Sequence, residues 1–292
     1  MKPGPFIYHT PRAMGELLAL LASHQDDAAI IAGGQSLVPL LRFRLAQPQH
    51  VISLRGMASE FPAVVVDNGK LVIGACVTYA ALQRSEAAAQ ACPALPAAIR
   101  LVATPAVRSR GTLCGNLCQA DPASELPAVC LAMDAQLRLR SAGGERVLPA
   151  REFFIGPYTT ARRPDEVLVA VEIARRPAAE RFSIKEVTRL RGGFPMAGVA
   201  VALIPGAGDA VQSVAIACFG VHAVQLRIPE AEASLRRNGC TPRGVAQAAD
   251  AIDAAVHPHG DAFASPAYRR AALRELFARA MGEVRGPAPE HA

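Results

Sequence analysis

Two short glycine-containing loops constrain the fold of this chain more than any other feature of its sequence. They are residues 32–36, with the sequence AGGQS, and residues 111–116, with the sequence GTLCGN. Each loop lies where an apolar, strand-like run gives way to a polar turn. Glycine lets the backbone approach a ligand closely and adopt unusual angles, and small hydroxyl and amide side chains bind oxygen atoms. The pair therefore indicates a site for an oxygen-rich anionic group.

The surroundings of the second loop strengthen this interpretation. Taken alone, the Gly33-Gly34 pair is typical of an ordinary strand-to-helix turn. Residues 103–127, however, form a long turn-rich stretch between two apolar segments. Ordering so long a loop costs conformational entropy, and such loops are uncommon in compact domains unless they bind a ligand. Neither the dinucleotide fingerprint G-x-G-x-x-G nor the phosphate loop G-x-x-x-x-G-K-[ST] occurs in the sequence. The common nucleotide-binding motifs are thereby excluded as matches.

The composition predicts a soluble protein with a large core. Of the 292 residues, 51% are hydrophobic and 19% are charged, which suits a chain of two domains or more. The net charge of +6 comes from scattered arginines and not from a compact basic run, so we expect no nucleic-acid partner. The N-terminus lacks an apolar signal core, and no apolar run reaches the roughly 18 residues of a membrane-spanning helix. We therefore expect a cytoplasmic protein without a membrane span.

The cysteines and histidines show no ligand pattern along the sequence. The cysteines number seven, an odd count, and many lie in apolar runs, which predicts reduced thiols in the cytosol. Cys114 and Cys118 are separated by three residues, but no second pair at metal-binding spacing follows them. The seven histidines are scattered. We therefore expect no metal or iron–sulfur site in this chain, and no catalytic Ser/His/Asp or Cys/His set.

The first part of the chain alternates helices and strands. Thr10-Pro11 is typical of a helix start, and the apolar run 28–31 predicts a buried strand that leads into the first glycine loop. Ser36 can cap a short helix over residues 36–45. Asn68-Gly69, between two β-rich runs, is a strong hairpin signal. Thr78 predicts the start of a further helix.

The chain changes character after residues 175–180, a polar segment that we interpret as a linker between two domains. Strands and then helices follow, over residues 182–189, 196–204, 211–221, 229–237, 243–256 and 266–284. This order favours an α+β domain with its helices on one face of an antiparallel sheet. We expect one domain over residues 1–177, with a small lobe at 1–57 and a larger lobe at 58–177, and a second domain over residues 178–292.

Several motifs, in their order along the chain, resemble the medium, FAD-binding subunit of the molybdenum hydroxylases, the family of xanthine and carbon monoxide dehydrogenases. The motifs are AGGQSL at 32–37, RLAQP at 44–48, GTLCGN at 111–116 and DPASELP at 121–127, with further similarity at 182–194 and 265–270. The resemblance runs over nearly the whole chain. It implies a two-lobed FAD-binding α/β domain of the vanillyl-alcohol-oxidase type, followed by a three-stranded antiparallel sheet and a C-terminal helical bundle.

The resemblance also implies which residues contact FAD. These are Ala32, Gly33, Gly34, Gln35, Ser36, Leu37, Thr104, Gly111, Thr112, Cys114, Gly115, Asn116, Asp121, Leu168, Val169, Lys185 and Phe194. It assigns Asp121 to the ribityl hydroxyls, although this side chain could instead cap the turn at Pro122. Leu168 or Val169 is expected beside the adenine or dimethylbenzene ring, with plain strand core as the alternative. Lys185 is expected at the pyrimidine edge of the flavin, with a solvated surface lysine as the alternative.

Three residues depart from the family pattern. Cys114 replaces the first glycine of a Gly-Gly pair, which puts a close backbone approach at that point in doubt. Gln35 replaces a histidine and Phe194 replaces a tyrosine of the carbon monoxide dehydrogenases. These two changes favour a heterocycle or an aldehyde over carbon monoxide as the substrate of the complex.

The function that the resemblance implies is that of an oxidoreductase subunit with noncovalent FAD. A large partner would oxidise the substrate at molybdopterin, and a small partner would carry 2Fe–2S clusters. Electrons would reach an external acceptor through the FAD of this chain, and the resemblance implies a dimer of heterotrimers. Two alternatives stay open at this point. One is a self-contained FAD-dependent oxidoreductase with its own substrate pocket, and the other is a nucleotide-binding scaffold without redox function.

Overall fold

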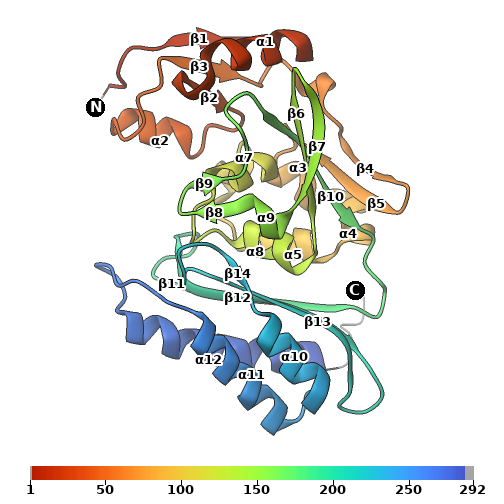
Figure 1. Ribbon diagram of the computed structural model, residues 1–292. Helices are drawn as coiled ribbons and strands as arrows, with labels where there is room; N and C mark the ends of the chain where they lie inside the picture. The colour runs from red at the N-terminus through yellow and green to blue at the C-terminus, as the bar shows by residue number, and fades with distance from the viewer. Residues whose placement is uncertain (1, 287–292) are drawn as a thin grey trace.

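The computed structural model describes residues 2–286 and has three parts stacked one upon another (Figure 1). A small N-terminal lobe lies at one end, a larger lobe lies in the middle, and a C-terminal sheet with three long helices forms the other end. Among the described residues, no helix is both long and apolar enough to span a bilayer.

The small lobe is a parallel sheet in the order β1-β3-β2. Its elements are β1 (Ile7–His9), α1 (Met14–His24), the 3₁₀ helix η1 (Gln25–Asp27), β2 (Ala28–Ile31), α2 (Leu37–Arg42) and β3 (His50–Ser53). Helix α1 buries Met14, Leu17, Leu18 and Leu21, the spacing of one helical face.

Both helix predictions in this lobe needed correction at a boundary. The first helix begins at Met14 with Ala13 at its N-cap, and not at Thr10-Pro11. The second begins at Leu37 as expected but ends at Arg42, short of residue 45. It ends there because Arg44 adopts a left-handed backbone with φ of 58°, which an α-helix cannot continue through.

The larger lobe is built on a five-stranded sheet in the order β4-β5-β10-β6-β7. Its strands are β4 (Val64–Asp67), β5 (Lys70–Gly74), β6 (Gln136–Ser141), β7 (Gly144–Pro149) and β10 (Val167–Ala174). All neighbouring pairs in this sheet are antiparallel, so the larger lobe combines its helices with an antiparallel sheet, whereas the sheet of the small lobe is parallel. The predicted hairpin is confirmed, since Asn68 and Gly69 join β4 to β5 with φ of 46° and 74°.

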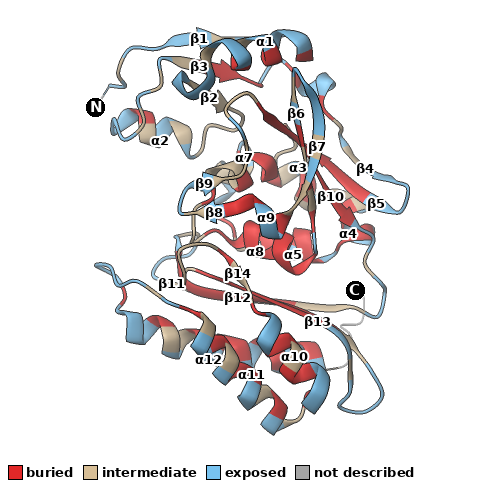
Figure 2. Cartoon of the chain, in the orientation of Figure 1, coloured by how far each residue is buried: buried red, intermediate tan, exposed pale blue. Residues whose placement is uncertain are grey.

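The helices of the larger lobe come mostly between β5 and β6. They are α3 (Tyr79–Gln83), α4 (Glu86–Ala91), α5 (Ala94–Ile99), α6 (Pro105–Arg108), α7 (Leu113–Gln119), α8 (Glu125–Ala132) and α9 (Ala150–Phe153), and a small hairpin adds β8 (Phe154–Gly156) and β9 (Thr159–Thr160). Thr78 caps α3 as predicted and accepts a hydrogen bond from the amide of Ala81 at 3.2 Å. Helices α5 and α8 lie buried between the two large sheets (Figure 2).

The C-terminal part follows the predicted order of strands and then helices. Its elements are β11 (Arg181–Thr188), β12 (Pro195–Pro205), β13 (Val211–Phe219), β14 (Leu226–Arg227), α10 (Pro229–Asn238), α11 (Pro242–Ala255) and α12 (Pro266–Arg285). The sheet is antiparallel and has four strands. Three of them were expected, and the fourth is the two-residue edge strand β14. A strand this short leaves no apolar alternation for sequence analysis to detect.

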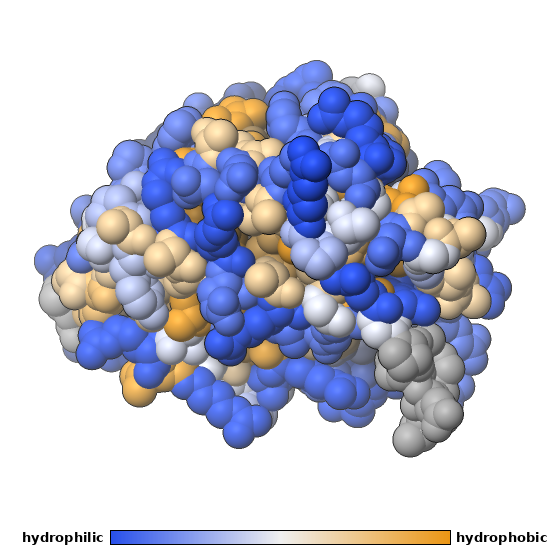
Figure 3. Space-filling model, turned by 90° about the horizontal axis from the view of Figure 1, so that it is seen from below, coloured by the Kyte–Doolittle hydropathy of each residue, from blue (hydrophilic) through white to orange (hydrophobic). Residues whose placement is uncertain are grey.

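Alternation along β12 and β13 divides the interior into two cores. Ala200, Ala202, Ala215 and Ala217 face the larger lobe, whereas Val199, Val201, Val214 and Ile216 face the helices. Successive side chains of a strand point to opposite faces, so the small residues lie against α8 and the larger ones under α10–α12. The outer face of these helices is mainly hydrophilic (Figure 3).

Candidate functional site

One large cleft lies where the small lobe, the larger lobe and the β11–β12 connection meet. The predicted residues that line it are Ala32, Gly33, Gly34, Gln35, Ser36, Leu37, Gly111, Thr112, Cys114, Gly115, Asn116, Leu168 and Phe194. The structure thus brings both glycine loops to one site. Thr104, Asp121, Val169 and Lys185 do not line it.

The two glycine loops contact each other through their backbones. A Cβ atom at Gly33 would overlap the carbonyl group of Arg110, and one at Gly111 would lie 2.7 Å from the Tyr79 ring. Gly33 is therefore required by the contact between the lobes, and Gly111 by the packing of its loop on α3 within the larger lobe, irrespective of any ligand. Gly34 has a different role, because its φ of 72° turns the chain from β2 into α2.

The first loop presents unpaired donors to the cleft. Within residues 2–286, the backbone N–H groups of Gln35, Ser36 and Leu37 donate to no acceptor. The first N–H groups of a helix lack partners within that helix, and α2 begins here. The side chain of Ser36 makes no capping hydrogen bond, so its hydroxyl is available as well.

The second loop has the same arrangement at the start of α7. Thr112 is the N-cap residue, and its hydroxyl accepts a hydrogen bond from the amide of Gly115 at 3.1 Å. Asn116 donates from Nδ2 to the hydroxyl of Ser124 at 2.6 Å. Its Oδ1 atom is buried without a partner among the described residues. A buried acceptor left unpaired is unfavourable, so this atom is well placed for a ligand hydroxyl or amide.

The cysteine at position 114 does not obstruct the loop. Its side chain is buried in the core of the larger lobe, with Sγ 3.9 Å from the carbonyl oxygen of Ile73. Burial raises the pKa of this thiol, which keeps it neutral. The side chain that replaces the family's glycine therefore packs on the side of α7 that faces the core.

Asp121 adopts the alternative role considered for it. Its Oδ1 atom accepts a hydrogen bond from the amide of Ala123 at 2.9 Å, which closes the turn at Pro122. Thr104 is likewise an N-cap residue, with its hydroxyl 3.5 Å from the amide of Val107. Both stabilise turns that flank the cleft.

Strand β10 contributes one of its two predicted residues. The pairing of β10 with β6 shifts between Leu168 and Ala170, so Val169 is the extra residue of a bulge. A bulge re-aims neighbouring side chains. Leu168 lines the cleft, while Val169 is part of the core behind it.

The structure places Lys185 away from the cleft. Its neighbours in β11, Phe182 and Ile184, face the larger lobe, so Lys185 points to the opposite face of the sheet. There its Nζ atom lies 2.6 Å from Oε2 of Glu283 in α12. The expectation that this lysine faces the flavin is wrong, because the phase of the strand alternation puts it on the helix side.

The cleft contains two charged residues that sequence analysis missed. Arg162 lies in the β9–β10 connection and donates from Nη1 to the carbonyl oxygen of Glu166 at 2.8 Å. Glu125 is the first residue of α8 and is 5% exposed. Its position in the DPASELP motif, at the start of a continuous apolar run, was the signal that could have found it.

Glu125 is electrostatically coupled to a second buried carboxyl group, that of Glu186 in β11. Burial raises the pKa of Glu125 to about 7. Burial and the charge of Glu125 raise the pKa of Glu186 to about 8. The Oε2 atom of Glu186 has no partner among the described residues. Each group therefore holds its proton to a higher pH than a solvated glutamate does.

The β11–β12 connection closes the cleft from the C-terminal side. Gly192, Gly193, Phe194 and Pro195 all line it. Gly192 has a φ of 75°, and a Cβ atom there would lie 2.7 Å from the carbonyl oxygen of Ala103. Phe194 is 75% exposed, so its ring is available to cover a planar ligand.

Comparison with known proteins gives the class to which this fold and cleft belong. Residues 4–175 match the family "FAD binding domain in molybdopterin dehydrogenase". Residues 182–284 match the family "CO dehydrogenase flavoprotein C-terminal domain". The chain therefore belongs to the FAD-binding subunits of the molybdenum hydroxylases.

Individual members of this family are similar to the chain over most of their own length. The chain is 34% identical to the nicotine 6-hydroxylase medium subunit of Paenarthrobacter nicotinovorans, over 97% of this chain and 99% of that one. It is 40% identical to the caffeine dehydrogenase subunit beta of a Pseudomonas strain, over 72% and 70%. A CO dehydrogenase structure from Oligotropha carboxidovorans superposes with a TM-score of 0.95 and 30% identity, over 99% and 100%.

The particular place of this chain within the class follows from these matches. It is the medium, FAD-carrying subunit of an oxidoreductase complex. The large molybdenum subunit and the small iron–sulfur subunit of such a complex are separate chains.

Proposed function

We propose that the cleft holds FAD noncovalently between the two glycine loops, with the pyrophosphate on the amides of Gln35, Ser36 and Leu37. The observation that carries the proposal is that these amides and the buried Oδ1 atom of Asn116 all lack partners within the described chain. An anion and a hydroxyl-rich chain supply the groups that these atoms need. The residues present therefore fit the cofactor.

The remaining groups of the cleft suit the other parts of the cofactor. Arg162 supplies a positive charge toward the anionic portion, and Gly111, Thr112 and Gly115 leave room for the ribityl chain. Leu168 and Phe194 offer apolar surface for a planar ring. When bound, FAD carries electrons between the iron–sulfur clusters of the partner and an external acceptor. The chain's own part is to bind, orient and shield it.

The finer features of the chain fit the same proposal. We assign residues 1–177 to the FAD-binding domain, of the vanillyl-alcohol-oxidase type, and residues 178–292 to the C-terminal domain. The chain operates in the cytoplasm, which the seven free cysteines support, and it does so within a dimer of heterotrimers. Gln35 and Phe194 support a heterocycle or an aldehyde as the substrate of the complex, in preference to carbon monoxide.

The substitution Ser36→Asp tests the pyrophosphate site without disturbing the fold. Aspartate is as favourable as serine at an N-cap, so the apoprotein should unfold at an unchanged temperature. Two like charges about 4 Å apart repel by about 4 kcal/mol at an effective dielectric constant of about 20. We therefore expect FAD affinity, measured by fluorescence titration of the apoprotein, to fall by at least about 100-fold.

The matched control is Ser85→Asp. Ser85 is the N-cap residue of α4, and its hydroxyl accepts a hydrogen bond from the amide of Ala88 at 3.2 Å. Ser85→Asp adds the same charge at the same kind of helix position but outside the cleft. The affinity of this variant for FAD should therefore equal that of the wild type. If Ser36→Asp bound FAD as tightly as the wild type does, the assignment of the pyrophosphate to this loop would be wrong.

A further inference from the structure

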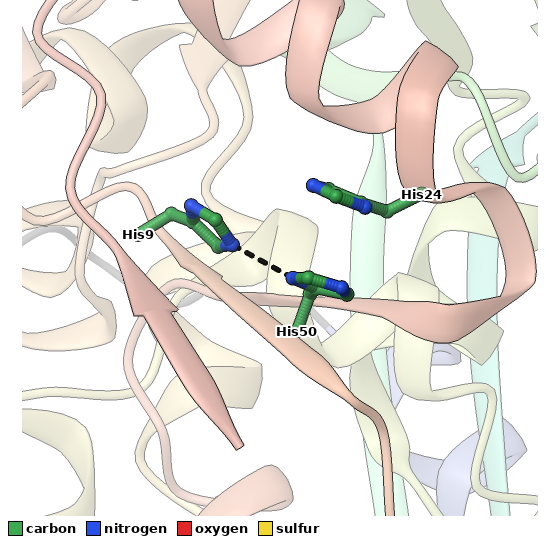
Figure 4. A group of neighbouring side chains, drawn as sticks. All are labelled: His9, His24 and His50. Carbon is green, nitrogen blue, oxygen red and sulfur yellow. Dashed lines mark hydrogen bonds between the residues drawn. The ribbon is translucent and has the colours of Figure 1, made fainter.

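Three histidines from separate elements gather in the small lobe, outside the FAD cleft (Figure 4). His9 ends β1, His24 ends α1 and His50 begins β3. The Nε2 atom of His9 lies 2.9 Å from Nδ1 of His50. The rings of His24 and His50 are stacked with their centroids 3.5 Å apart. Three histidines that are far apart in the sequence thus meet in three dimensions.

The topology of the lobe explains why these three residues meet. Strands β1 and β3 are parallel neighbours, with Ile7 opposite His50 and His9 opposite Ile52, so the two histidines are diagonal neighbours across the pair. Helix α1 then runs back over the sheet and ends at His24, where η1 turns the chain into β2. Residues 15 and 26 positions apart in sequence thus reach one point.

The cluster has the donor chemistry of a metal site. One ring nitrogen from each histidine can be chosen so that all three lie within 4.8 Å of one another. Zinc binds histidine nitrogens at about 2.0–2.1 Å, so two ligands in a tetrahedral site lie about 3.3–3.4 Å apart. The His9 Nε2 and His50 Nδ1 atoms are 2.9 Å apart, and the three ligand nitrogens lie within 4.8 Å of one another. Rotation of these half-buried side chains about χ1 and χ2 can bring the nitrogens to the required spacing.

A neutral imidazole ring keeps a lone pair for a metal ion, so a site of this kind binds metal only while its histidines are deprotonated. Asp27 acts on His50 electrostatically, and its carboxylate would offset part of the charge that a divalent cation brings.

We propose that His9, His24 and His50 form a binding site for a late first-row divalent cation of the zinc class. Imidazole ligands suit Zn²⁺, Cu²⁺ and Ni²⁺ and not Mg²⁺ or Ca²⁺, which prefer oxygen. The bound ion joins β1, α1 and β3, so its role is to stabilise the small lobe. Strand β2, which lines the FAD cleft, pairs directly with β3 and is held in place with it.

Metal titration of the full, FAD-loaded chain tests the proposal. After treatment with a chelator, Zn²⁺ added alone should bind with one-to-one stoichiometry in calorimetry and raise the unfolding temperature. Co²⁺ in its place should give the intense visible absorption of a tetrahedral site. His24→Ala should weaken Zn²⁺ binding by about 100-fold or more, since it removes one ligand of three, and should abolish the rise in unfolding temperature.

The C-terminal part of the chain provides a matched control. His222 and His257 form another histidine pair, with ring centroids 5.6 Å apart, and they test for non-specific binding to surface imidazoles. His257→Ala should leave Zn²⁺ affinity unchanged. His9→Gln, which keeps a polar side chain, serves if His24→Ala fails to fold, and FAD content reports on the fold in each variant. Equal losses in His257→Ala and His24→Ala, or no one-to-one binding of Zn²⁺, would overturn the proposal.

Discussion

At the scale of single residues, the coupled carboxyl groups of Glu125 and Glu186 make stability depend on pH. Their pKa values are raised to about 7 and about 8 in the folded chain, whereas a glutamate in the unfolded chain has its ordinary pKa of about 4.5. Between these values the folded state binds more protons than the unfolded state. Their contribution to stability is therefore full below about pH 4.5 and is lost as the pH rises toward about 8.

This linkage predicts how Glu186→Gln behaves. The variant cannot ionise at this position, so its unfolding temperature at pH 9 should exceed that of the wild type by several degrees. At about pH 3, where the wild-type carboxyl group is protonated in both states, the two proteins should unfold at similar temperatures. Thermal unfolding across this pH range is the measurement. Glu145→Gln, which changes an exposed glutamate of β7, is the control, and an equal gain there would refute the assignment to burial.

At the scale of elements, the two faces of β12 differ in how much volume they can accept. Ala200 is fully buried against the larger lobe, where α8 crosses the sheet. Val201, the next residue, is fully buried on the helix side. Gly198 on the same strand has no room at all, because a Cβ atom there would overlap the ring of Phe219. The close approach of α8 to the sheet thus depends on small side chains.

We therefore expect Ala200→Leu to destabilise the chain by about 1–3 kcal/mol through overpacking. Val201→Ile adds only one methylene, on the other face, and should therefore cost less than Ala200→Leu. Urea unfolding of both variants and the wild type gives the two differences. A larger cost for Val201→Ile than for Ala200→Leu would contradict the assignment of the small residues to the tight face.

At the scale of the whole molecule, the chain supplies FAD to a complex whose substrate is oxidised elsewhere. We expect the purified chain to carry one noncovalent FAD, which should separate from the polypeptide on denaturation and ultrafiltration. The chain alone should not oxidise an aldehyde or a purine, because no molybdenum or iron–sulfur ligand set occurs among residues 2–286. Its flavin should still be reducible by dithionite. Sustained turnover of an organic substrate by the isolated chain would instead support a self-contained oxidoreductase.

The sequence was sufficient for features that depend on neighbouring residues. The Asn68-Gly69 hairpin, the capping by Thr78 and the two glycine loops are local signals, and the structure places each as expected. Lys185 was misplaced because alternation in β11 shows two faces but not which of them meets the larger lobe. The histidine cluster was missed because parallel pairing and a helix end bring its members together. No spacing along the chain records that juxtaposition.

The contact between Gly33 and the carbonyl of Arg110 has a thermodynamic consequence for cofactor loading. Because the two glycine loops touch backbone to backbone, neither can move far without the other, and the lobes fix both before any ligand arrives. A preorganised site loses little conformational entropy when it is filled. The entropy lost in ordering this cleft is therefore part of the free energy of folding, and it does not reduce the affinity for FAD.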